Sequence, residues 1–201
     1  MTEYTAELEE RIIAWVRKRE SAKRFAHTER VVDAVTMLAE KWSPDYLTVC
    51  RLAGWIHDAC KSYSDAKMLQ RAQKYRVPIG PIEWEKPMLL HGVIAYHRAA
   101  KKFDLDDERI KSACAHHTTG HPDMNLTDKL VFLADLIEPE RNFPLVDHIR
   151  DLAMIDVDKA MLLAVDGSLR YLLSSKRIID PRLLLLYNQL VRQLDDAPYQ
   201  N

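Results

Sequence analysis

The sequence predicts a single all-α domain. Its 201 residues include only 5 glycines, which leaves little material for the tight turns of β-hairpins. Apolar residues recur with helical spacing along most of the chain, and no stretch shows the alternating pattern of a strand. With 47% hydrophobic and 29% charged residues, the composition is that of a folded domain with a substantial core.

The charge balance and the first residues exclude several classes of protein. A formal net charge of -1 argues against a broadly basic nucleic-acid binder, although it allows a local positive pocket. No apolar run approaches the roughly 18 residues of a membrane span, so we expect no membrane partner. The acidic start MTEYTAELEE lacks the apolar core of an export signal. Three cysteines without paired spacing complete the expectation of a cytoplasmic protein with reduced, core-packed thiols.

Apolar stripes and capping residues predict the first three helices. Stripes over Leu8 to Val16 and Val31 to Trp42 predict the first two. Ser43 then acts as an N-cap with Pro44 at the first helical position of a third helix. That helix carries the following residues on one face: Leu47, Cys50, Gly54 and His57.

Proline and glycine divide the middle of the chain. A short helix follows Ser64, and the segment from Val77 to Pro87, with three prolines and a glycine, is expected to be mostly loop. Apolar spacing then predicts helices from Pro87 to about Phe103 and from about Asp106 to His117. The polar segment from Thr118 to Asn125 is expected to be a turn.

The last third of the chain is also helical by pattern. Asn125, with Asp128 three residues later, can cap a helix that ends near Ile137. The segment from Pro139 to Pro144 breaks it, and two or three helices follow, the last beginning at Pro181. The late apolar stripes belong to the core or to the surface of a homodimer.

Four polar residues fall on the apolar stripes of four different predicted helices. They are His27, His57, His117 and Asp135. One histidine at such a position is usually a hydrogen-bonded core residue, but four inward groups each need a partner. A shared metal ion satisfies them together, because imidazole nitrogens and carboxylate oxygens are common metal ligands.

The order of these residues is more specific than their burial. His27, the adjacent pair His57 and Asp58, and Asp135 form the pattern H…HD…D. Adjacent helical residues point about 100° apart, so the pair reaches one ion only near a helix end or a cavity wall. The chain lacks a P-loop, a dinucleotide-binding glycine motif and paired-cysteine zinc spacings. Metal-assisted hydrolysis is therefore the chemistry that the residues favour.

The pattern H…HD…D is the signature of the HD-domain metal-dependent phosphohydrolases. Further segments narrow the likeness: HTERV at His27, HDACK at His57, LLHG at Leu89, HHTTGHPDMNL at His116 and LADLIEPERNFPLVDHIR at Leu133. On these segments, which run in order between about Arg24 and Asn188, the sequence resembles the YqeK family of bacterial HD proteins. Members of that family are symmetrical dinucleoside-tetraphosphate hydrolases.

The resemblance implies a fold and an activity. The fold is a single-domain helical HD-domain phosphohydrolase, with residues 1–22 as an N-terminal helix of the same domain, residues 23–194 as the HD hydrolase domain and residues 195–201 as a frayed tail. The activity is cleavage of diadenosine tetraphosphate into two ADP at a binuclear metal site. The metal is commonly iron, with manganese, cobalt or another divalent ion as alternatives. Bound partners would be a dinucleoside polyphosphate or a nucleotide like ADP or GDP, and not nucleic acid.

The resemblance also implies roles by position. The metal ligands would be His27, His57, Asp58, His91, His117 and Asp135. The catalytic residues would be Asp58, as the bridging carboxylate, with His91 and His117. Contacts to phosphate or nucleotide would come from Arg24, Lys61, Thr118 and Arg141, together with His91 and His117. His121 departs from the family pattern after HTTG, which leaves the rim of the nucleotide pocket open.

The remaining polar residues have simpler expected roles. We interpret His97 as a core histidine, His116 as support for the following turn and His148 as a surface or packing residue. Glu138 and Asp128 are interpreted as charges at helix ends.

Two other functions remain open from the sequence. The first is an HD phosphohydrolase that acts on nucleoside mono- or triphosphates or on cyclic nucleotides. The second is a catalytically silent nucleotide-binding protein on an HD scaffold, although the complete ligand set argues against it because buried charges are costly.

Overall fold

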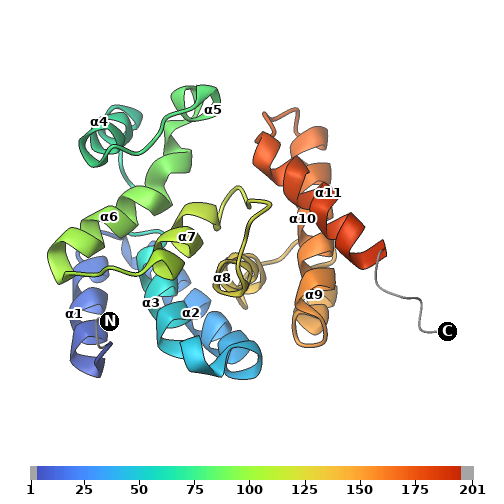
Figure 1. Cartoon of the computed structure of the whole chain (residues 1–201), viewed down its shortest axis with the longest axis horizontal. Helices are drawn as coiled ribbons and strands as arrows, with labels where there is room; N and C mark the ends of the chain where they lie inside the picture. The colour runs from blue at the N-terminus through green and yellow to red at the C-terminus, as the bar shows by residue number, and fades with distance from the viewer. Residues whose placement is uncertain (1–3, 196–201) are drawn as a thin grey trace.

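Helices account for every regular element between residues 4 and 195, the part of the chain that this computed structural model describes (Figure 1). They are α1 (Ala6–Arg17), α2 (Ala22–Trp42), α3 (Leu47–Ile56), α4 (Asp65–Tyr75), α5 (Pro81–Glu85), α6 (His91–Phe103), α7 (Glu108–His116), α8 (Leu126–Ile137), α9 (Val146–Ala153), α10 (Val157–Ser174) and α11 (Pro181–Asp195). Short 3-10 turns occupy Pro44–Tyr46 and Pro87–Leu90. The predicted all-α fold class is confirmed.

Side-chain caps set several of the helix starts. The Ser21 hydroxyl accepts a hydrogen bond from the backbone N–H of Arg24 at the start of α2. At α8 the predicted cap is confirmed, because the Asn125 side chain accepts from the Asp128 N–H at 3.1 Å. The Asp128 carboxylate accepts in return from the Asn125 N–H at 3.3 Å. Pro181 is the first residue of α11, as predicted.

The expectation of a loop from Val77 to Pro87 is only partly correct. The short helix α5 lies within it and begins with Pro81. Glu83 stabilises this start by accepting a hydrogen bond from the Gly80 N–H at 3.0 Å. Proline breaks the interior of a helix but fits its first turn, so a proline-rich segment can still begin helices. Pro87 likewise begins a 3-10 turn, and α6 starts four residues later than predicted.

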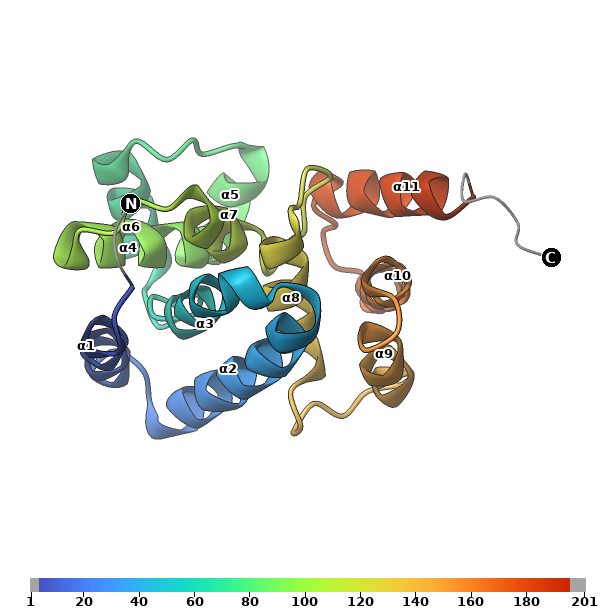
Figure 2. The same cartoon turned by 60° about the horizontal axis from the view of Figure 1, so that its bottom comes forward.

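The helices around the centre of the molecule pack closely against one another. Helix α2 packs on α3 and α8, and α7 packs on α3, α6 and α8 (Figures 1 and 2). The three cysteines, Cys50, Cys60 and Cys114, are free and fully buried among these helices, as predicted. These helices and the residues directly after them also carry the predicted metal ligands, which are His27, His57, Asp58, His91, His117 and Asp135.

Residues outside this centre extend the molecule at both ends. Helix α1 packs against α3 and α6, and α10 packs against α8, α9 and α11. In both views α1, α4 and α6 lie at one end and α9 to α11 at the other (Figures 1 and 2). None of the described helices has the length and apolar character needed to cross a membrane. Residues 196–201 of the predicted tail lie outside the described residues; the domain division and the homodimer stay predictions.

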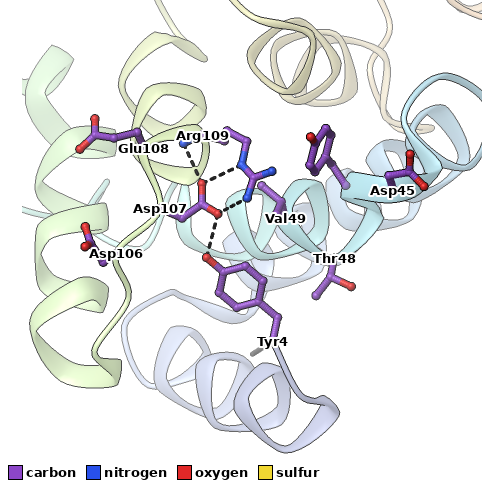
Figure 3. Close-up of a pocket in the computed structure, with 9 residues that line it drawn as sticks. Tyr4, Asp45, Thr48, Val49, Asp106, Asp107, Glu108 and Arg109 are labelled. Atoms are coloured by element: carbon purple, nitrogen blue, oxygen red, sulfur yellow. Dashed lines mark hydrogen bonds and ion pairs between the residues drawn. The ribbon is translucent and has the colours of Figure 1, made fainter. Parts of the chain in front are cut away.

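The segment before α1 is held by the start of α7. The Tyr4 hydroxyl donates to the Asp107 carboxylate at 2.9 Å, and the Arg109 guanidinium donates to both oxygens of the same carboxylate (Figure 3). Asp107 also caps α7 by accepting from the Arg109 N–H at 2.8 Å. These residues line a surface pocket of about 610 Å³. Because Tyr4 and Arg109 pair both oxygens of the Asp107 carboxylate, we interpret the residues of this pocket as structural.

Gly92, in the first turn of α6, tests how tightly α6 and α7 pack. A Cβ at this position would lie 1.9 Å from the carbonyl oxygen of Cys114. We expect Gly92→Ala to lower the free energy of unfolding by about 3 kcal/mol or more, because the clash is with backbone and α6 must shift. Chemical denaturation measures the change.

Gly167 provides the matched control, because nothing lies within 4 Å of a Cβ added there in α10. Gly167→Ala should raise the free energy of unfolding by about 0.5–1 kcal/mol, since alanine favours the helix. Equal stabilities for the two variants would contradict the close contact at Gly92.

Candidate metal centre

Helix ends place most of the candidate ligands. His57 directly follows the last residue of α3, and Asp58 lies in the turn after it. His91 is the first residue of α6, and His117 directly follows α7. The expectation that the adjacent pair needs a helix end is therefore confirmed. His27 projects from α2 and Asp135 from α8 to complete the cluster.

Three of the histidines use the same local hydrogen bond. In each, ring Nδ1 lies against the backbone carbonyl three residues earlier. The distances are 2.6 Å from His57 to Gly54, 2.6 Å from His91 to Met88 and 2.8 Å from His117 to Cys114. Because a carbonyl oxygen only accepts, Nδ1 carries the hydrogen in all three rings. The Nε2 atoms are thus the ones turned to the shared centre, as is usual for metal-bound histidines.

The Nε2 atoms converge on Asp58. Its Oδ1 lies 2.9 Å from His91 Nε2 and 3.5 Å from His117 Nε2, and these two nitrogens are 2.9 Å apart. The Nε2 atom of His57 is buried and has no hydrogen-bond partner between residues 4 and 195. The ring centroids of His57 and His117 are 4.9 Å apart. Such a set of close, under-satisfied acceptors is the arrangement that a cation completes.

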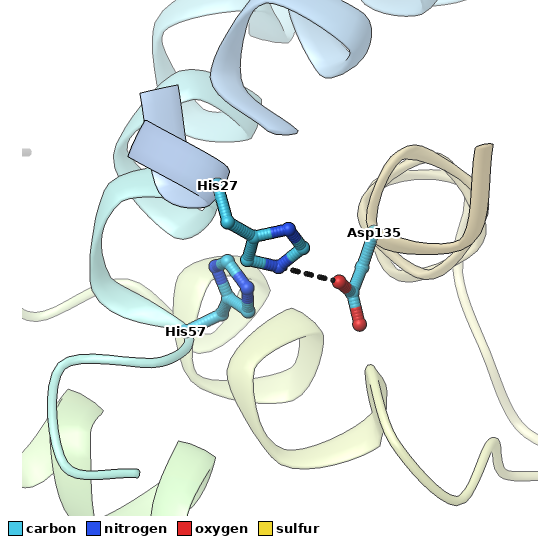
Figure 4. A group of neighbouring side chains, drawn as sticks. All are labelled: His27, His57 and Asp135. Atoms are coloured by element: carbon cyan, nitrogen blue, oxygen red, sulfur yellow. Dashed lines mark ion pairs between the residues drawn. The ribbon is translucent and has the colours of Figure 1, made fainter. Parts of the chain in front are cut away.

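The candidate ligand atoms form two overlapping groups. One comprises His27, His57 and Asp135, and Figure 4 shows these side chains facing one another from three elements. The other comprises His57, Asp58 and His117. Within each group the ligand atoms lie within 4.8 Å of one another. His27 Nε2 and Asp135 Oδ1 are 3.0 Å apart. His57 belongs to both groups.

The protonation states suit metal binding. Burial lowers the pKa of His57 and the pKa of His91 to about 4, so both rings are neutral near pH 7. Burial alone would raise the pKa of Asp58, but Arg24 Nη1 and Lys61 Nζ contact this carboxylate and favour its ionised form. The pKa of Asp135 is lowered, despite burial, by the hydrogen bond with His27. Hydrogen bonds with Asp135 and Glu138 in turn raise the pKa of His27, although burial alone would lower it. The neutral imidazoles of His57 and His91 and the two carboxylates form a donor set that could hold a divalent metal.

The predicted phosphate-contact residues lie at the same cluster. Arg24 Nη1 is 2.9 Å from Asp58 Oδ2, and Lys61 Nζ is 3.3 Å from Asp58 Oδ1. Arg141 Nη2 is 2.6 Å from Asp135 Oδ1. Thr118, which is exposed, has its hydroxyl 3.0 Å from His117 Nε2. All ten residues that the resemblance implied are therefore brought together, and their individual roles stay predictions.

Comparison with known proteins identifies the family. The HD domain model matches residues 24–140, more than half of the chain. The chain belongs to the HD-domain family. The predicted membership is thus confirmed, and the HD domain is a hydrolase domain.

Curated relatives and a solved structure extend this similarity over nearly the whole chain. A symmetrical bis(5'-nucleosyl)-tetraphosphatase of Bacillus subtilis is 30% identical over 182 residues, which cover 90% of this chain and 97% of that protein. The protein of the same name from Halalkalibacterium halodurans is 31% identical and covers 84% of this chain and 89% of its own length. A crystal structure of a predicted HD superfamily hydrolase involved in NAD metabolism from Clostridium acetobutylicum has a TM-score of 0.85 at 28% identity, over 92% of this chain and 97% of that chain.

Glu138 supports the candidate metal centre in a way that the sequence did not reveal. We call this cluster the HD centre; it comprises His27, His57, Asp58, His91, His117 and Asp135. Glu138 follows α8, as predicted, but its side chain is buried. Its Oε1 lies 3.1 Å from His27 Nδ1, and its Oε2 accepts from Arg30 Nε at 2.6 Å. The interpretation as a helix-end charge is therefore correct in position, but it misses the contacts with His27 and Arg30. A negative charge at the C-terminus of a helix interacts unfavourably with the helix dipole. This unfavourable position was the one feature of the sequence that could have indicated a second role for Glu138.

Glu20 is a second residue that the sequence did not reveal. It lies between α1 and α2 and accepts a hydrogen bond from the Thr28 hydroxyl at 2.8 Å. With Arg24, Asp58 and Lys61 it lines a pocket of about 200 Å³ beside the HD centre. Burial raises the pKa of Glu20 to about 7. A carboxylate in an interhelical connection has no pattern that distinguishes it from a solvated charge.

The other polar residues surround the HD centre without entering it. Asp128, interpreted as a helix-end charge, does cap α8, and it also accepts from the Ser112 hydroxyl at 2.6 Å. His116 Nδ1 lies 3.1 Å from the same carboxylate, which agrees with support for the turn. His121 stacks on His116, with ring centroids 4.6 Å apart.

Two further histidines lie away from the centre. His148 is exposed, as predicted. His97 is not a core residue, because it is half-buried and stacks on Tyr75 instead.

The contact between Glu138 and His27 gives a test of the HD centre. Substitution Glu138→Gln removes the charge that orients His27 and pairs with Arg30. Metal affinity should fall about 10- to 100-fold, the usual cost of losing such a supporting carboxylate. Metal content after equilibrium dialysis at graded metal concentrations measures the change.

Glu140→Gln is the matched control, since this exposed carboxylate also pairs with Arg30, at 2.8 Å, but does not touch His27. Its metal affinity should equal that of the unaltered protein. The same loss in both variants would show that the effect comes from Arg30 rather than from His27.

Proposed function

We propose that this protein is a divalent-metal-dependent hydrolase that splits diadenosine tetraphosphate symmetrically into two ADP. The similarity to two curated symmetrical bis(5'-nucleosyl)-tetraphosphatases, which extends over 97% and 89% of their lengths, is the observation that carries the proposal. The cluster of ten implied residues around Asp58 and Asp135 supports it.

The proposed metal ligands fall into the two groups described above. His27, His57 and Asp135 would hold one ion, and Asp58, His91 and His117, with His57 nearby, would hold the other. Iron is the ion that the resemblance implies, and manganese and cobalt accept the same nitrogen and oxygen donors. When bound, a pair of such ions supplies an activated water and neutralises charge on the phosphoryl oxygens.

The basic residues at the HD centre would position the substrate. A tetraphosphate bridge has about four negative charges, more than the two ions comfortably neutralise beside two carboxylates. Arg24, Lys61 and Arg141 each contact a ligand carboxylate while remaining partly exposed, with 38%, 24% and 39% of their side chains accessible. They can therefore hold the carboxylates and also bind phosphate oxygens. The exposed Thr118 hydroxyl can donate a further hydrogen bond.

Symmetry of the cut follows from which phosphorus is attacked. Water addition at either of the two inner phosphorus atoms, with cleavage of the central bridge, gives one ADP on each side. The leaving group is itself a phosphate anion, so little acid assistance is needed. Positioning and charge stabilisation by the ions and the basic residues then account for most of the catalysis.

Product analysis tests the proposed reaction. Metal-loaded protein incubated with diadenosine tetraphosphate should give ADP as the sole product on anion exchange. Formation of AMP and ATP would support hydrolysis of this substrate but overturn the proposal that the cleavage is symmetrical. Absence of any product, with metal confirmed bound, would overturn this substrate in favour of another phosphorylated nucleotide.

Ligand variants test the metal dependence. Removal of a shared or central ligand, in His57→Ala or Asp58→Ala, should abolish both bound metal and turnover, while circular dichroism shows the helices retained. His148→Ala, at an exposed position, should change neither. Turnover that persists in His57→Ala or Asp58→Ala would overturn the assignment of these residues.

A further inference from the structure

At the end of the molecule formed by α1, α4 and α6 (Figures 1 and 2), these helices and the turn after α1 carry a second cluster of cations. It lines a groove of about 350 Å³, which we call the cationic groove. Its residues are Trp15, Arg19, Arg71, Lys74, Tyr75, Arg98, Lys101 and Lys102. Six of these eight are basic and none is acidic, in a protein whose formal net charge is -1. The groove is therefore locally basic, although the protein as a whole is nearly neutral.

The three arginines of the cationic groove lack carboxylate partners. Arg19, Arg71 and Arg98 are half-buried, yet none forms an ion pair with any residue between 4 and 195. The Nε atoms of Arg19 and Arg71 are buried and have no hydrogen-bond partner in the same range. Arg19 Nη1 does donate to the Trp15 carbonyl at 2.7 Å. Charged groups that leave solvent are normally paired with the opposite charge, so three guanidiniums without a carboxylate partner in one groove favour an anion.

The charges of Arg19 and Arg98 also lie close enough to repel each other. Burial lowers the pKa of Arg19, and the nearby charge of Arg98 lowers it further. A bound anion would relieve this repulsion. The exposed Lys74, Lys101 and Lys102 add charge at the rim, which favours a ligand with several negative charges over a single carboxylate.

The aromatic residues of the groove indicate what kind of anion fits. Trp15 is buried, with the Arg19 guanidinium 4.1 Å from its ring centroid. Tyr75 stacks on His97, with centroids 5.3 Å apart. Burial therefore closes Trp15 to stacking by a ligand, and His97 covers one face of Tyr75. Binding of single-stranded nucleic acid depends on aromatic faces available to the bases, so this groove suits phosphate groups rather than a nucleic acid.

We propose that the cationic groove is a second anion site, which binds a compact polyphosphate through Arg19, Arg71 and Arg98. The site is separate from the HD centre and does not depend on the substrate proposed above. The two adjoin at Arg19, which also lines the pocket beside Asp58 and Lys61. The shared chemistry is a chain of phosphates, either inorganic or part of a nucleotide.

Isothermal titration calorimetry of the metal-loaded full chain tests the proposal with imidotriphosphate, a polyphosphate with hydrolysis-resistant P–N–P bridges. The variant Arg71→Gln/Arg98→Gln should bind one anion fewer per chain than the unaltered protein, or bind it at least roughly tenfold more weakly. Loss of one binding event is expected whether or not the HD centre also binds the probe. A failure of the proposed function therefore leaves this test intact.

Matched controls separate the groove from general charge. Lys159→Gln/Arg170→Gln removes two exposed cations of α10, at the other end of the molecule, and should bind like the unaltered protein. If Arg71→Gln/Arg98→Gln does not fold by circular dichroism, Lys74→Gln/Lys101→Gln at the exposed rim replaces it, with a smaller loss of affinity expected. Unchanged binding in the groove variant, or an equal loss in the α10 variant, would overturn the proposal.

Two further probes distinguish the sources of the phosphates. Equal affinity for imidotriphosphate and for adenylyl imidodiphosphate would support a site for phosphates alone. Tighter, groove-dependent binding of the nucleotide would support a nucleotide's phosphates as the ligand. A single-stranded RNA of 12 nucleotides is the third probe. If it binds to the groove more tightly than either small anion, the proposal of a compact polyphosphate ligand is overturned in favour of nucleic acid.

Discussion

The burial of Asp58 among imidazole lone pairs is the constraint on which the centre of this structure depends. Only 2% of the residue is accessible, and His57 and His91 beside it are fully buried. An ionised carboxylate in such a place is costly unless cations and hydrogen bonds surround it. The ends of α3, α6 and α7 meet around this carboxylate, and their backbone carbonyls hold the rings with Nε2 inward. A divalent cation could complete what the helices leave unsatisfied.

The basic residues of the protein divide into two sets by their partners. Arg24, Lys61 and Arg141 face the carboxylates of the HD centre and compensate their charge. Arg19, Arg71 and Arg98 line one groove and form no ion pair with any residue between 4 and 195. The first set suits a phosphate substrate that would bind the metal ions and the basic side chains at the same time. The second set suits an anion that would bind to basic side chains alone. Arg19 lies where the two regions adjoin, so phosphates bound at both would be close to each other.

The sequence predicted the members of the cluster better than it predicted the residues that support them. His27, His57, His117 and Asp135 could be found because polar residues on apolar stripes conflict with the local pattern, and Asp58 because it follows His57 in the pattern H…HD…D. His91 and the basic residues needed the family resemblance, since each has an ordinary structural alternative. Glu138 was misread because its contact is with a histidine 111 positions away along the chain. The short helix α5 was missed because a proline inside a polar segment is compatible with both a loop and a helix start.

Sequence alone determined the helical class and several helix boundaries, because these depend on local periodicity and capping. It also predicted the free, buried cysteines and contained the HD motif in order. Tertiary structure alone decided which polar atoms meet. Three features join residues from distant parts of the chain. They are the two overlapping groups of candidate ligands, the pairing of Arg24 with Asp58 and of Arg141 with Asp135, and the arginines of the cationic groove. Charge pairing is a property of distances in space, and helical periodicity fixes only the face on which a residue lies.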